Sequence, residues 1–190
     1  MRIDYRDGSV HGERVVLRQM TRADVDQMAL WPPYVEPEFQ WANLRLATAR
    51  DRDDYYEYGR SGPTRERFTV FGPNGAVIGT ISLRNVDRST RRGTLGIILR
   101  SDEVGRGYGY DAVRCLLHYA FNVMGLDEVL LDVAEGNERA RRCYERVGFL
   151  RIGQHLGGDA TMYVDMVIHR RAFARAEEAL AERAGARRLG

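Results

Sequence analysis

The chain has little cysteine and no spacing that suggests a metal site. Cys115 and Cys143 are the only cysteines among its 190 residues. Two cysteines cannot form a disulfide framework, and neither lies in a Cys-x-x-Cys pair. The four histidines are scattered without the spacing of metal ligands. We therefore expect no structural metal and a reducing, cytoplasmic environment.

Long apolar runs and a large net charge are also missing. No apolar stretch approaches the roughly 20 residues that a membrane helix needs. Residues 1–10 lack the apolar core and cleavage site of a signal peptide. With 29 basic and 27 acidic residues the formal net charge is +2, so charge does not indicate a nucleic-acid partner. The basic end at Arg183, Arg187 and Arg188 is more typical of a solvated terminus.

What is present is the composition of one globular domain. Hydrophobic residues make up 44% and charged residues 29% of the chain, an ordinary balance for a soluble fold. We expect a tail at residues 1–12, a domain at residues 13–169 and a helical tail at residues 170–190. Residues 172–184 are rich in alanine and alternating charges, which predicts an exposed terminal helix.

The first half of the chain predicts mainly strands. Residues 14–18 read as a strand, and Thr21 as the N-cap of a helix that ends at the prolines of residues 31–33. Residues 34–62 are polar and rich in aromatics, and we expect a loop with a short helix. An antiparallel meander is predicted for three strands joined by turns at residues 73–75 and 87–90, namely residues 67–71, 76–83 and 93–99.

The second half alternates helices and strands, which predicts an α/β (α+β) class. Apolar residues of helical period cover residues 108–124, and Gly125 is the expected stop. A second helix at residues 137–147 has Asn137 as N-cap and Gly148 just beyond its end. The remaining strands are expected at residues 129–134, 150–154 and 162–169.

A glycine-rich loop, residues 105–110, joins a predicted strand to a predicted helix. Its glycines let the main chain approach a ligand, and free N–H groups at a helix start bind anions such as a diphosphate. By itself the loop is equally compatible with a mobile turn. A G-x-G-x-x-G dinucleotide fingerprint that began at Gly105 would need glycine where Tyr110 stands. One that began at Gly107 would place Ala112 last, a substitute that some such motifs accept, but the preceding strands form an antiparallel meander and not the start of a βαβ unit. The chain also has no G-K-[ST] tripeptide of a Walker A loop.

Two motifs resemble the GNAT N-acetyltransferase superfamily. Residues 104–109 are similar to its R/Q-x-x-G-x-G/A cofactor motif, with Val104 where arginine or glutamine is usual. Residues 137–149 match its N-x-x-A-x-x-x-Y-x-x-x-G-F block. The resemblance covers residues 14–169 and is closest to the RimJ/RimL-like branch, which acetylates ribosomal-protein N-termini, polyamines and antibiotics.

The resemblance implies a mixed, largely antiparallel sheet that is splayed at an acetyl-CoA site, and transfer of an acetyl group to a primary amine. Backbone near Ile97 and Leu99 would pair with the pantetheine arm, and Tyr144 would protonate the leaving thiolate. The implied cofactor-binding residues are Ile97, Ile98, Leu99, Val104, Gly105, Arg106, Gly107, Tyr108, Gly109, Tyr110, Asn137, Ala140 and Tyr144.

The residues that would handle the amine are less clear in the sequence. The strand at residues 93–99 carries no carboxylate, so Glu135 is a candidate base, with Glu103 or a water chain as alternatives. Trp31, Tyr34 and Trp41 are candidates for the acceptor site. The acceptor would be a small molecule or a protein N-terminus, and the chain a monomer or homodimer.

Two other functions stay open at this point. One is a non-catalytic acyl-CoA sensor with the same fold, and the other is a nucleotide-binding domain of another class. Loop spacing argues against the second.

Overall fold

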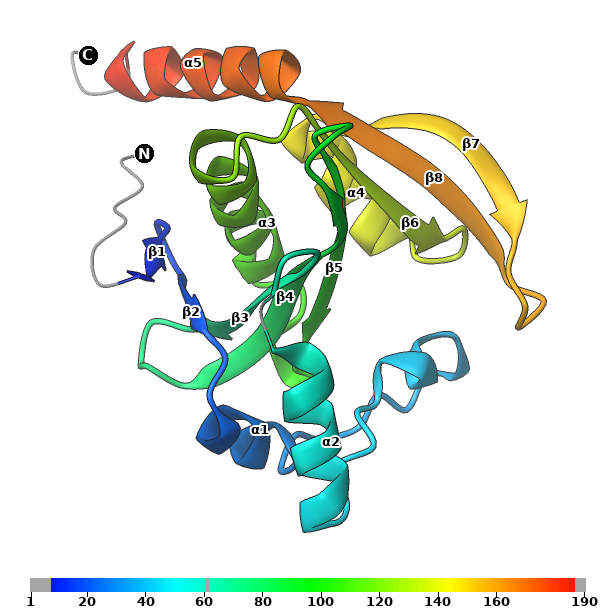
Figure 1. Ribbon diagram of the computed structural model, residues 1–190. Coiled ribbons are helices and arrows are strands. Elements are labelled where there is room, and N and C mark those ends of the chain that lie inside the picture. Colours follow the sequence, from blue (N-terminus) through cyan, green and yellow to red (C-terminus); the bar gives the residue numbers. More distant parts are fainter. Residues whose placement is uncertain (1–7, 61, 187–190) are drawn as a thin grey trace.

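An eight-stranded sheet forms the centre of the fold, in the order β1-β2-β3-β4-β5-β6-β8-β7 (Figure 1). The computed structural model describes residues 8–60 and 62–186. Predictions for residues 1–7, Arg187 and Arg188 therefore lie outside the described residues. The strands are β1 (Val10–His11), β2 (Val16–Gln19), β3 (Glu66–Phe71), β4 (Val77–Asp87), β5 (Arg92–Leu99), β6 (Glu128–Ala134), β7 (Leu150–Leu156) and β8 (Met162–His169).

Neighbouring strands are antiparallel except for β5 and β6, which run parallel. The predicted meander is confirmed as β3–β4–β5, and β4 extends four residues beyond the predicted end, to Asp87. The Asp87 carboxylate closes the next turn, where it accepts hydrogen bonds from the N–H groups of Ser89 (2.8 Å) and Thr90 (3.2 Å). The mixed, mostly antiparallel sheet confirms the predicted fold class.

The first strand was not expected. Val10–His11 pairs with β2, and Val10 is only 1% exposed. A two-residue strand is too short to display the alternation that identifies strands in a sequence. The division at residue 13 stays a prediction, although the packed core already includes Val10.

The helices largely follow the predicted periodicity. Thr21 caps α1 through a capping box with Asp24, as predicted. Thr48 and Asp51 form the same box for α2, an 11-residue helix in the region where we expected a loop and a short helix. The helical elements are α1 (Arg22–Met28), η2 (Pro37–Ala42), α2 (Ala49–Gly59), η3 (Ser101–Glu103), α3 (Tyr108–His118), η4 (Tyr119–Val123), α4 (Glu138–Val147) and α5 (Arg170–Ala186).

The predicted helix at residues 108–124 is continuous but changes its winding. After α3 the chain makes the π-helical turn η4, where the Met124 N–H donates to the Tyr119 carbonyl (3.1 Å). Gly125 follows with φ +73°, the left-handed conformation expected of a helix stop.

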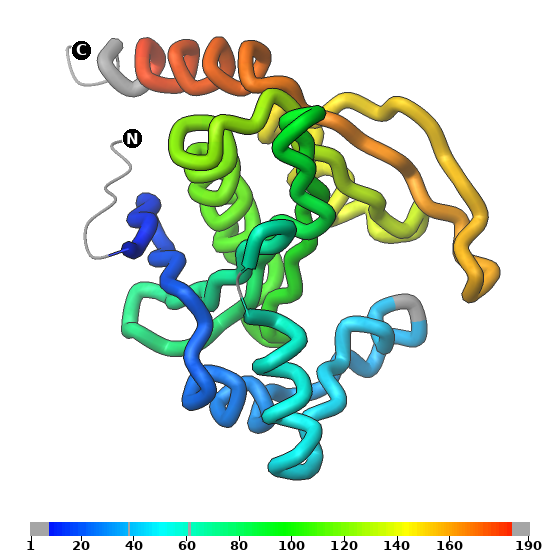
Figure 2. Tube along the Cα trace, viewed as in Figure 1, coloured from blue at the N-terminus to red at the C-terminus, as the bar shows by residue number. Residues whose placement is uncertain are grey.

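The two faces of the sheet carry different helices. Phe68 and Val70 of β3 belong to the main core with α3 and α4, whereas Phe71 packs in a second cluster with α1 and α2. Successive strand residues point to opposite faces, so α3 and α4 cover one face and α1 and α2 cover the other. We call the second face the α2 face. The tube in Figure 2 shows α1 and α2 at the opposite end of the molecule from α5.

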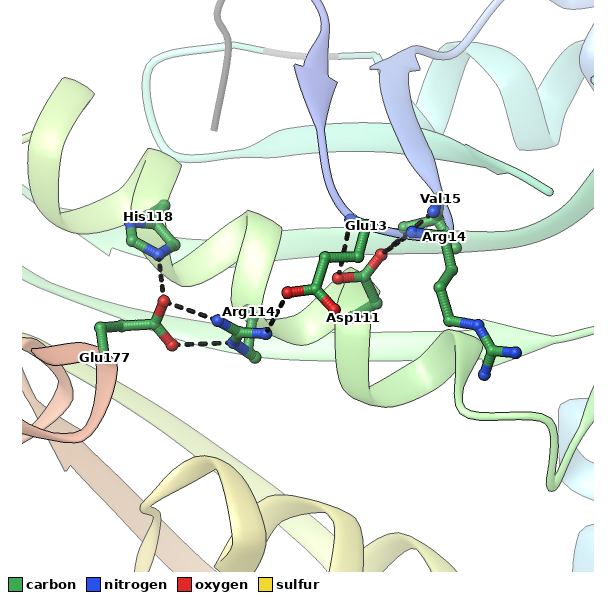
Figure 3. A network of polar contacts seen from close by, with 7 residues as sticks. All are labelled: Glu13, Arg14, Val15, Asp111, Arg114, His118 and Glu177. Carbon is green, nitrogen blue, oxygen red and sulfur yellow. Dashed lines mark hydrogen bonds and ion pairs between the residues drawn. The ribbon is translucent and has the colours of Figure 1, made fainter. Parts of the chain in front are cut away.

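Most described residues of the terminal helix are exposed, as predicted, but one face of the helix packs against the domain. Phe173 is 4% exposed and packs against the rings of Phe121 and His118. The Glu177 carboxylate accepts two hydrogen bonds from Arg114, each 2.7 Å, and lies 2.9 Å from the His118 ring (Figure 3). One face of α5 is therefore docked on α3 and η4, and alanine-rich composition gave no sign of it.

Candidate functional site

A central cavity opens where β5 and β6 separate. Their pairing covers only Arg92–Glu128 to Thr94–Leu130, and Figure 1 shows the strands diverging beyond it. The cavity has a volume of about 580 Å³. It extends from the glycine-rich loop past α4 to the α2 face of the sheet, and the predicted splay is confirmed.

Backbone groups of β5 face this gap. The Arg100 N–H donates to the Ile78 carbonyl of the preceding strand (2.8 Å). Hydrogen bonding alternates along an antiparallel pair, so the N–H and C=O groups of Ile97 and Leu99 point away from β4. The Tyr34 hydroxyl donates to the Leu99 carbonyl from the gap side (2.9 Å). The N–H groups of Ile97 and Leu99 and the Ile97 carbonyl thus face the gap, where a strand-like ligand could pair with them. The Leu99 carbonyl already accepts from Tyr34, and the backbone of Ile98 is used by β4.

Two glycines of the glycine-rich loop adopt left-handed backbone conformations. Gly105 and Gly107 adopt φ of +78° and +85°, which side chains with a Cβ rarely tolerate. Gly107 is the N-cap of α3, and no side chain caps this helix. Because the first-turn N–H groups of a helix have no partners within it, they and the helix dipole favour an anion here. A Cβ on Gly109 would stand 3.3 Å from the Leu99 side chain.

Two residues outside the loop hold it in place. The Arg14 guanidinium donates to the Arg106 carbonyl (2.6 Å). Asp111, in the first turn of α3, accepts from the N–H groups of Glu13, Arg14 and Val15 (Figure 3). These contacts fasten the loop and the start of α3 to the segment before β2. Asp111 lies about one hundred residues from its partners along the chain, so no local signal could identify them.

Helix α4 brings two further predicted groups to the cavity. Asn137 caps the helix, its Oδ1 accepting from the Ala140 N–H (3.1 Å), which confirms the capping prediction. Tyr144 is 8% exposed, and burial raises the pKa of its hydroxyl well above the ordinary value of 10. Burial also raises the pKa of Cys143 to about 11, so this thiol is protonated at neutral pH and a poor nucleophile.

Most of the predicted site residues meet at the cavity. Those that line it are Tyr34, Trp41, Ile97, Ile98, Leu99, Val104, Gly105, Gly107, Gly109, Tyr110, Asn137, Ala140 and Tyr144. Trp41 is 58% exposed and Tyr34 half-buried. Burial raises the pKa of the Tyr34 hydroxyl.

Four predicted residues are not among the lining residues. Glu135 is exposed, and its side chain stays outside the cavity. Arg106 pairs with Glu103 (3.3 Å), and Tyr108 lies beside Arg14. Trp31 donates through Nε1 to the Val77 carbonyl (3.2 Å), in the cluster beneath α1.

The structure adds polar residues that sequence reasoning missed. Five of them surround the α2-face end of the cavity, namely Tyr55, Arg67, Thr80, Ser82 and Arg84. The sixth, Asp132, lies on β6. Arg67, Ser82 and Gly96 stand in register across β3, β4 and β5. Polar residues inside largely apolar strands were a signal in the sequence, but only the register brings them together.

Comparisons with known proteins agree with this geometry. The family described as "Acetyltransferase (GNAT) domain" matches residues 14–150. The "Putative ribosomal N-acetyltransferase YdaF" of Bacillus subtilis (strain 168) is 35% identical over 96 residues, 50% of this chain and 51% of that protein. The spermidine N(1)-acetyltransferase of Vibrio cholerae is 29% identical over 87 residues, 46% of this chain and 50% of that protein.

A further relative and two solved structures extend the comparison. The aminoglycoside N(6′)-acetyltransferase type 1 of Klebsiella pneumoniae is 36% identical over 84 residues, 44% of this chain and 41% of that protein. The chain thus spans about half the length of the curated relatives it matches. Vibrio cholerae spermidine N-acetyltransferase in complex with CoA and spermine superimposes with a TM-score of 0.68 at 20% identity, covering 84% of this chain and 98% of that one. A chimera of the same enzyme with hSSAT gives a TM-score of 0.70 at 21% identity, covering 84% and 98%. These two structures share the fold.

Proposed function

The chain belongs to the acetyltransferase (GNAT) domain family, and we propose that it transfers an acetyl group from acetyl-CoA to a primary amine of a small molecule or a protein N-terminus by direct attack. The observation that carries this proposal is one cavity that links the uncapped start of α3 to the buried Tyr144 hydroxyl. The match to the ribosomal N-acetyltransferase relative supports the RimJ/RimL-like branch.

Acetyl-CoA suits the residues along this cavity. The left-handed glycines and free N–H groups at the start of α3 suit a diphosphate, and no side chain at Gly105 or Gly107 obstructs it. The gap-facing backbone of Ile97 and Leu99 suits the two amides of a pantetheine arm, in the manner of an added strand. Val104 stands where the family motif usually has arginine or glutamine. The diphosphate site does not depend on that side chain, because backbone N–H groups supply its donors. Bound acetyl-CoA supplies the activated acyl group.

Tyr144 is proposed as the general acid. Its raised pKa keeps the phenol protonated at neutral pH, so it can donate to a leaving thiolate, whose conjugate thiol has a pKa of about 8.5. An N–H of β5 near Leu99 is proposed to stabilise the oxyanion of the tetrahedral intermediate. Cys143 is protonated, which supports direct attack over a covalent cysteine route.

For the proton acceptor we propose Asp132 in preference to Glu135. An alkyl amine has a pKa of about 10.4 and must lose a proton before it attacks. Asp132 lines the cavity, and its charge reaches Tyr144, since it contributes to the raised pKa of that hydroxyl. Glu135 has neither property. The side chain of Asp132 alternates with buried Leu131 and Val133 and so points to the α2 face, from which an acceptor can approach.

The test is a panel of amines mixed with protein and acetyl-CoA, with release of free thiol as the readout. The panel includes polyamines, aminoglycosides, amino acids and N-terminal peptides, because the relatives named above act on different amines. We expect thiol release with at least one class. Cofactor binding without release for any amine would favour the acyl-CoA sensor instead.

Tyr144→Phe separates the enzyme from the sensor. Loss of a general acid lowers turnover by about 10²–10⁴-fold, and we expect kcat to fall in that range while the Kd for CoA, measured by calorimetry, stays unchanged. Tyr58→Phe, on an exposed tyrosine of α2, is the control. Unaltered kcat in Tyr144→Phe would remove this residue from the mechanism.

A further inference from the structure

The charges around the central cavity are strongly uneven. Among the described residues that line it, Asp132 is the only carboxylate, whereas five arginines face it: Arg67, Arg84, Arg139, Arg142 and Arg146. The whole chain contains no lysine, so every one of its 29 basic residues is an arginine. An acceptor that enters this cavity meets an excess of positive charge.

Three of the five arginines lie on α4. Arg146 lies over the ring of Tyr110 at the start of α3, 4.3 Å from its centroid. Arg142 pairs with Glu138 on the same helix, and Arg139 lies over Phe39 at the rim. The position of Arg146 at the start of α3 suits the phosphates of acetyl-CoA. Arg142 is already paired, and Arg139 lies on the side of Tyr34 and Phe39.

Arg67 and Arg84 lie instead on the α2 face, the face from which the acceptor is proposed to approach. Arg67 on β3 is opposite Ser82 on β4, and Ser82 is opposite Gly96 on β5. Arg84 is two residues from Ser82 and shares its face. Asp132 also points to this face from β6. The α2-face end of the cavity therefore offers two guanidinium groups and one carboxylate.

The guanidinium of Arg84 is placed to receive an anion. Its Nη2 would be 3.3 Å from a Cβ on Gly96, so it stretches across β5 at a position where glycine leaves room. Its Nε is buried and has no hydrogen-bond acceptor within the described part of the chain. The Arg67 guanidinium lies over the ring of Tyr55 on α2, 4.8 Å from its centroid, which orients it. The buried Nε of Arg84 has no acceptor among the described residues, and a bound carboxylate would supply one.

We propose, building on the acetyl transfer proposed above, that the acceptor is an amine that carries its own carboxylate within a few bonds of the nitrogen, such as an amino acid. Arg84, assisted by Arg67, binds the carboxylate, and Asp132 takes the proton of the ammonium group. The amine then attacks the acetyl carbonyl, forming the C–N bond as the C–S bond of the thioester breaks, and the thiolate takes a proton from Tyr144. The second proton that the nitrogen loses on becoming an amide passes through solvent to the Tyr144 phenolate and restores the phenol. A polyamine is disfavoured because its distal ammonium groups would meet two guanidiniums and no further carboxylate.

Matched pairs of acceptors test the proposal. Each amino acid is compared with the amine that lacks only its carboxylate, for example phenylalanine with phenethylamine, and both are compared with spermidine and kanamycin. Turnover of a tetrapeptide with an acidic N-terminal residue is compared with turnover of the same peptide with a neutral one. A preference for the acidic peptide would show that a protein N-terminus can supply the carboxylate. We expect kcat/KM to be about tenfold or more higher for the carboxylate-bearing member of each pair, the range for one hydrogen bond to a charged group.

Variants show whether the two arginines cause the preference. Arg84→Gln should lower kcat/KM about tenfold or more for the carboxylate-bearing acceptor, leave the KM for acetyl-CoA unchanged, and have little effect on the amine that lacks the carboxylate. Arg84→Lys should recover part of the loss. Arg84→Glu should improve turnover of spermidine. Arg88→Gln, on the exposed turn after β4, is the matched control.

The outcomes separate the two proposals. Equal loss in Arg84→Gln for amines with and without a carboxylate, or preference for spermidine or kanamycin in the wild type, overturns the carboxylate selectivity and leaves acetyl transfer standing. No thiol release with any amine overturns acetyl transfer itself.

Discussion

At the scale of single residues, Tyr144 and Asp132 approach the cavity from opposite faces of the sheet. Tyr144 belongs to the core formed with α3 and α4, whereas Asp132 points to the α2 face. In the mechanism proposed above, the acid and the base therefore lie on opposite sides of the thioester, and each takes part in a separate proton transfer.

Asp132 and Glu135 can be separated by paired substitutions. We expect Asp132→Asn to lower kcat/KM about 10²-fold or more, because a positioned base is typically worth this much. Glu135→Gln should lower it less, since that carboxylate is exposed outside the cavity. The measurement is kcat/KM as a function of pH for both variants. A larger loss in Glu135→Gln would return the base to the position predicted from sequence.

At the scale of elements, the start of α3 combines strain with binding. A residue with a Cβ in the left-handed conformation costs about 1–2 kcal/mol, so Gly107→Ala should destabilise the fold by that amount. A Cβ there would also stand 2.9 Å from the Arg14 guanidinium that holds the loop. We expect the Kd for CoA, measured by calorimetry, to rise about tenfold or more, which corresponds to roughly 1.4 kcal/mol.

Gly75→Ala is the matched control for this substitution. Gly75 has φ +70° in the turn between β3 and β4, and nothing lies near its missing Cβ. Its replacement carries the same backbone strain at a distance from the cavity. Equal weakening of CoA binding in both variants would show that general destabilisation, rather than the loop, is responsible.

The docking of α5 depends on one carboxylate. Burial opposes ionisation of Glu177, but hydrogen bonds from His118 and Arg114 outweigh it and lower its pKa to about 2, against an ordinary value of 4.5. A lowered pKa in the folded state adds stability above pH 4.5, and that stability is lost as the pH falls toward 2.

Glu177→Gln tests this linkage. We expect its free energy of unfolding at neutral pH to be about 1–3 kcal/mol below that of the wild type, the range for hydrogen bonds to charged groups. The difference should shrink as the pH falls from 4.5 toward 2 in urea titrations. Glu178→Gln, on the exposed neighbouring residue, should differ little at any pH. A pH-independent difference would exclude the ionised carboxylate as its source.

At the scale of the whole molecule, the ligand site lies between two parts of one sheet. The strands β1 to β5 form one part and β6 to β8 the other, and they meet only along three residue pairs of β5 and β6. A ligand that occupies the gap bridges both parts, so binding should stabilise the entire fold rather than one element.

Thermal unfolding measures this effect. A ligand at one hundred times its Kd adds about 2.7 kcal/mol, and 1 kcal/mol raises Tm by about 2–4 °C for a chain of this size. We therefore expect saturating CoA to raise Tm by about 5–10 °C. NAD at the same concentration should have little effect, and stabilisation by NAD instead would support a nucleotide-binding domain of another class.

The sequence by itself determined most of the local conformations, and most of the site residues that it predicted line one cavity. Helical periodicity identified α3 and α4, and Gly125 and Gly148 marked the expected ends of the two helical segments, where the structure has left-handed backbone. Such features depend on the steric and hydrogen-bonding preferences of a few residues that are adjacent in the sequence. The same locality let two motifs predict residues that meet at one cavity.

Only the tertiary structure decided which distant groups face one another. The insertion of β8 between β6 and β7, the docking of Glu177 on Arg114 and the anchoring of the first strands by Asp111 all join residues far apart in the chain. Arg67, Arg84 and Asp132 share the α2 face for the same reason, since strand order and register place them there. The alternation of residues along a strand gives the face on which each side chain lies. Which side chains of other strands lie beside it depends on strand order and register in the complete sheet.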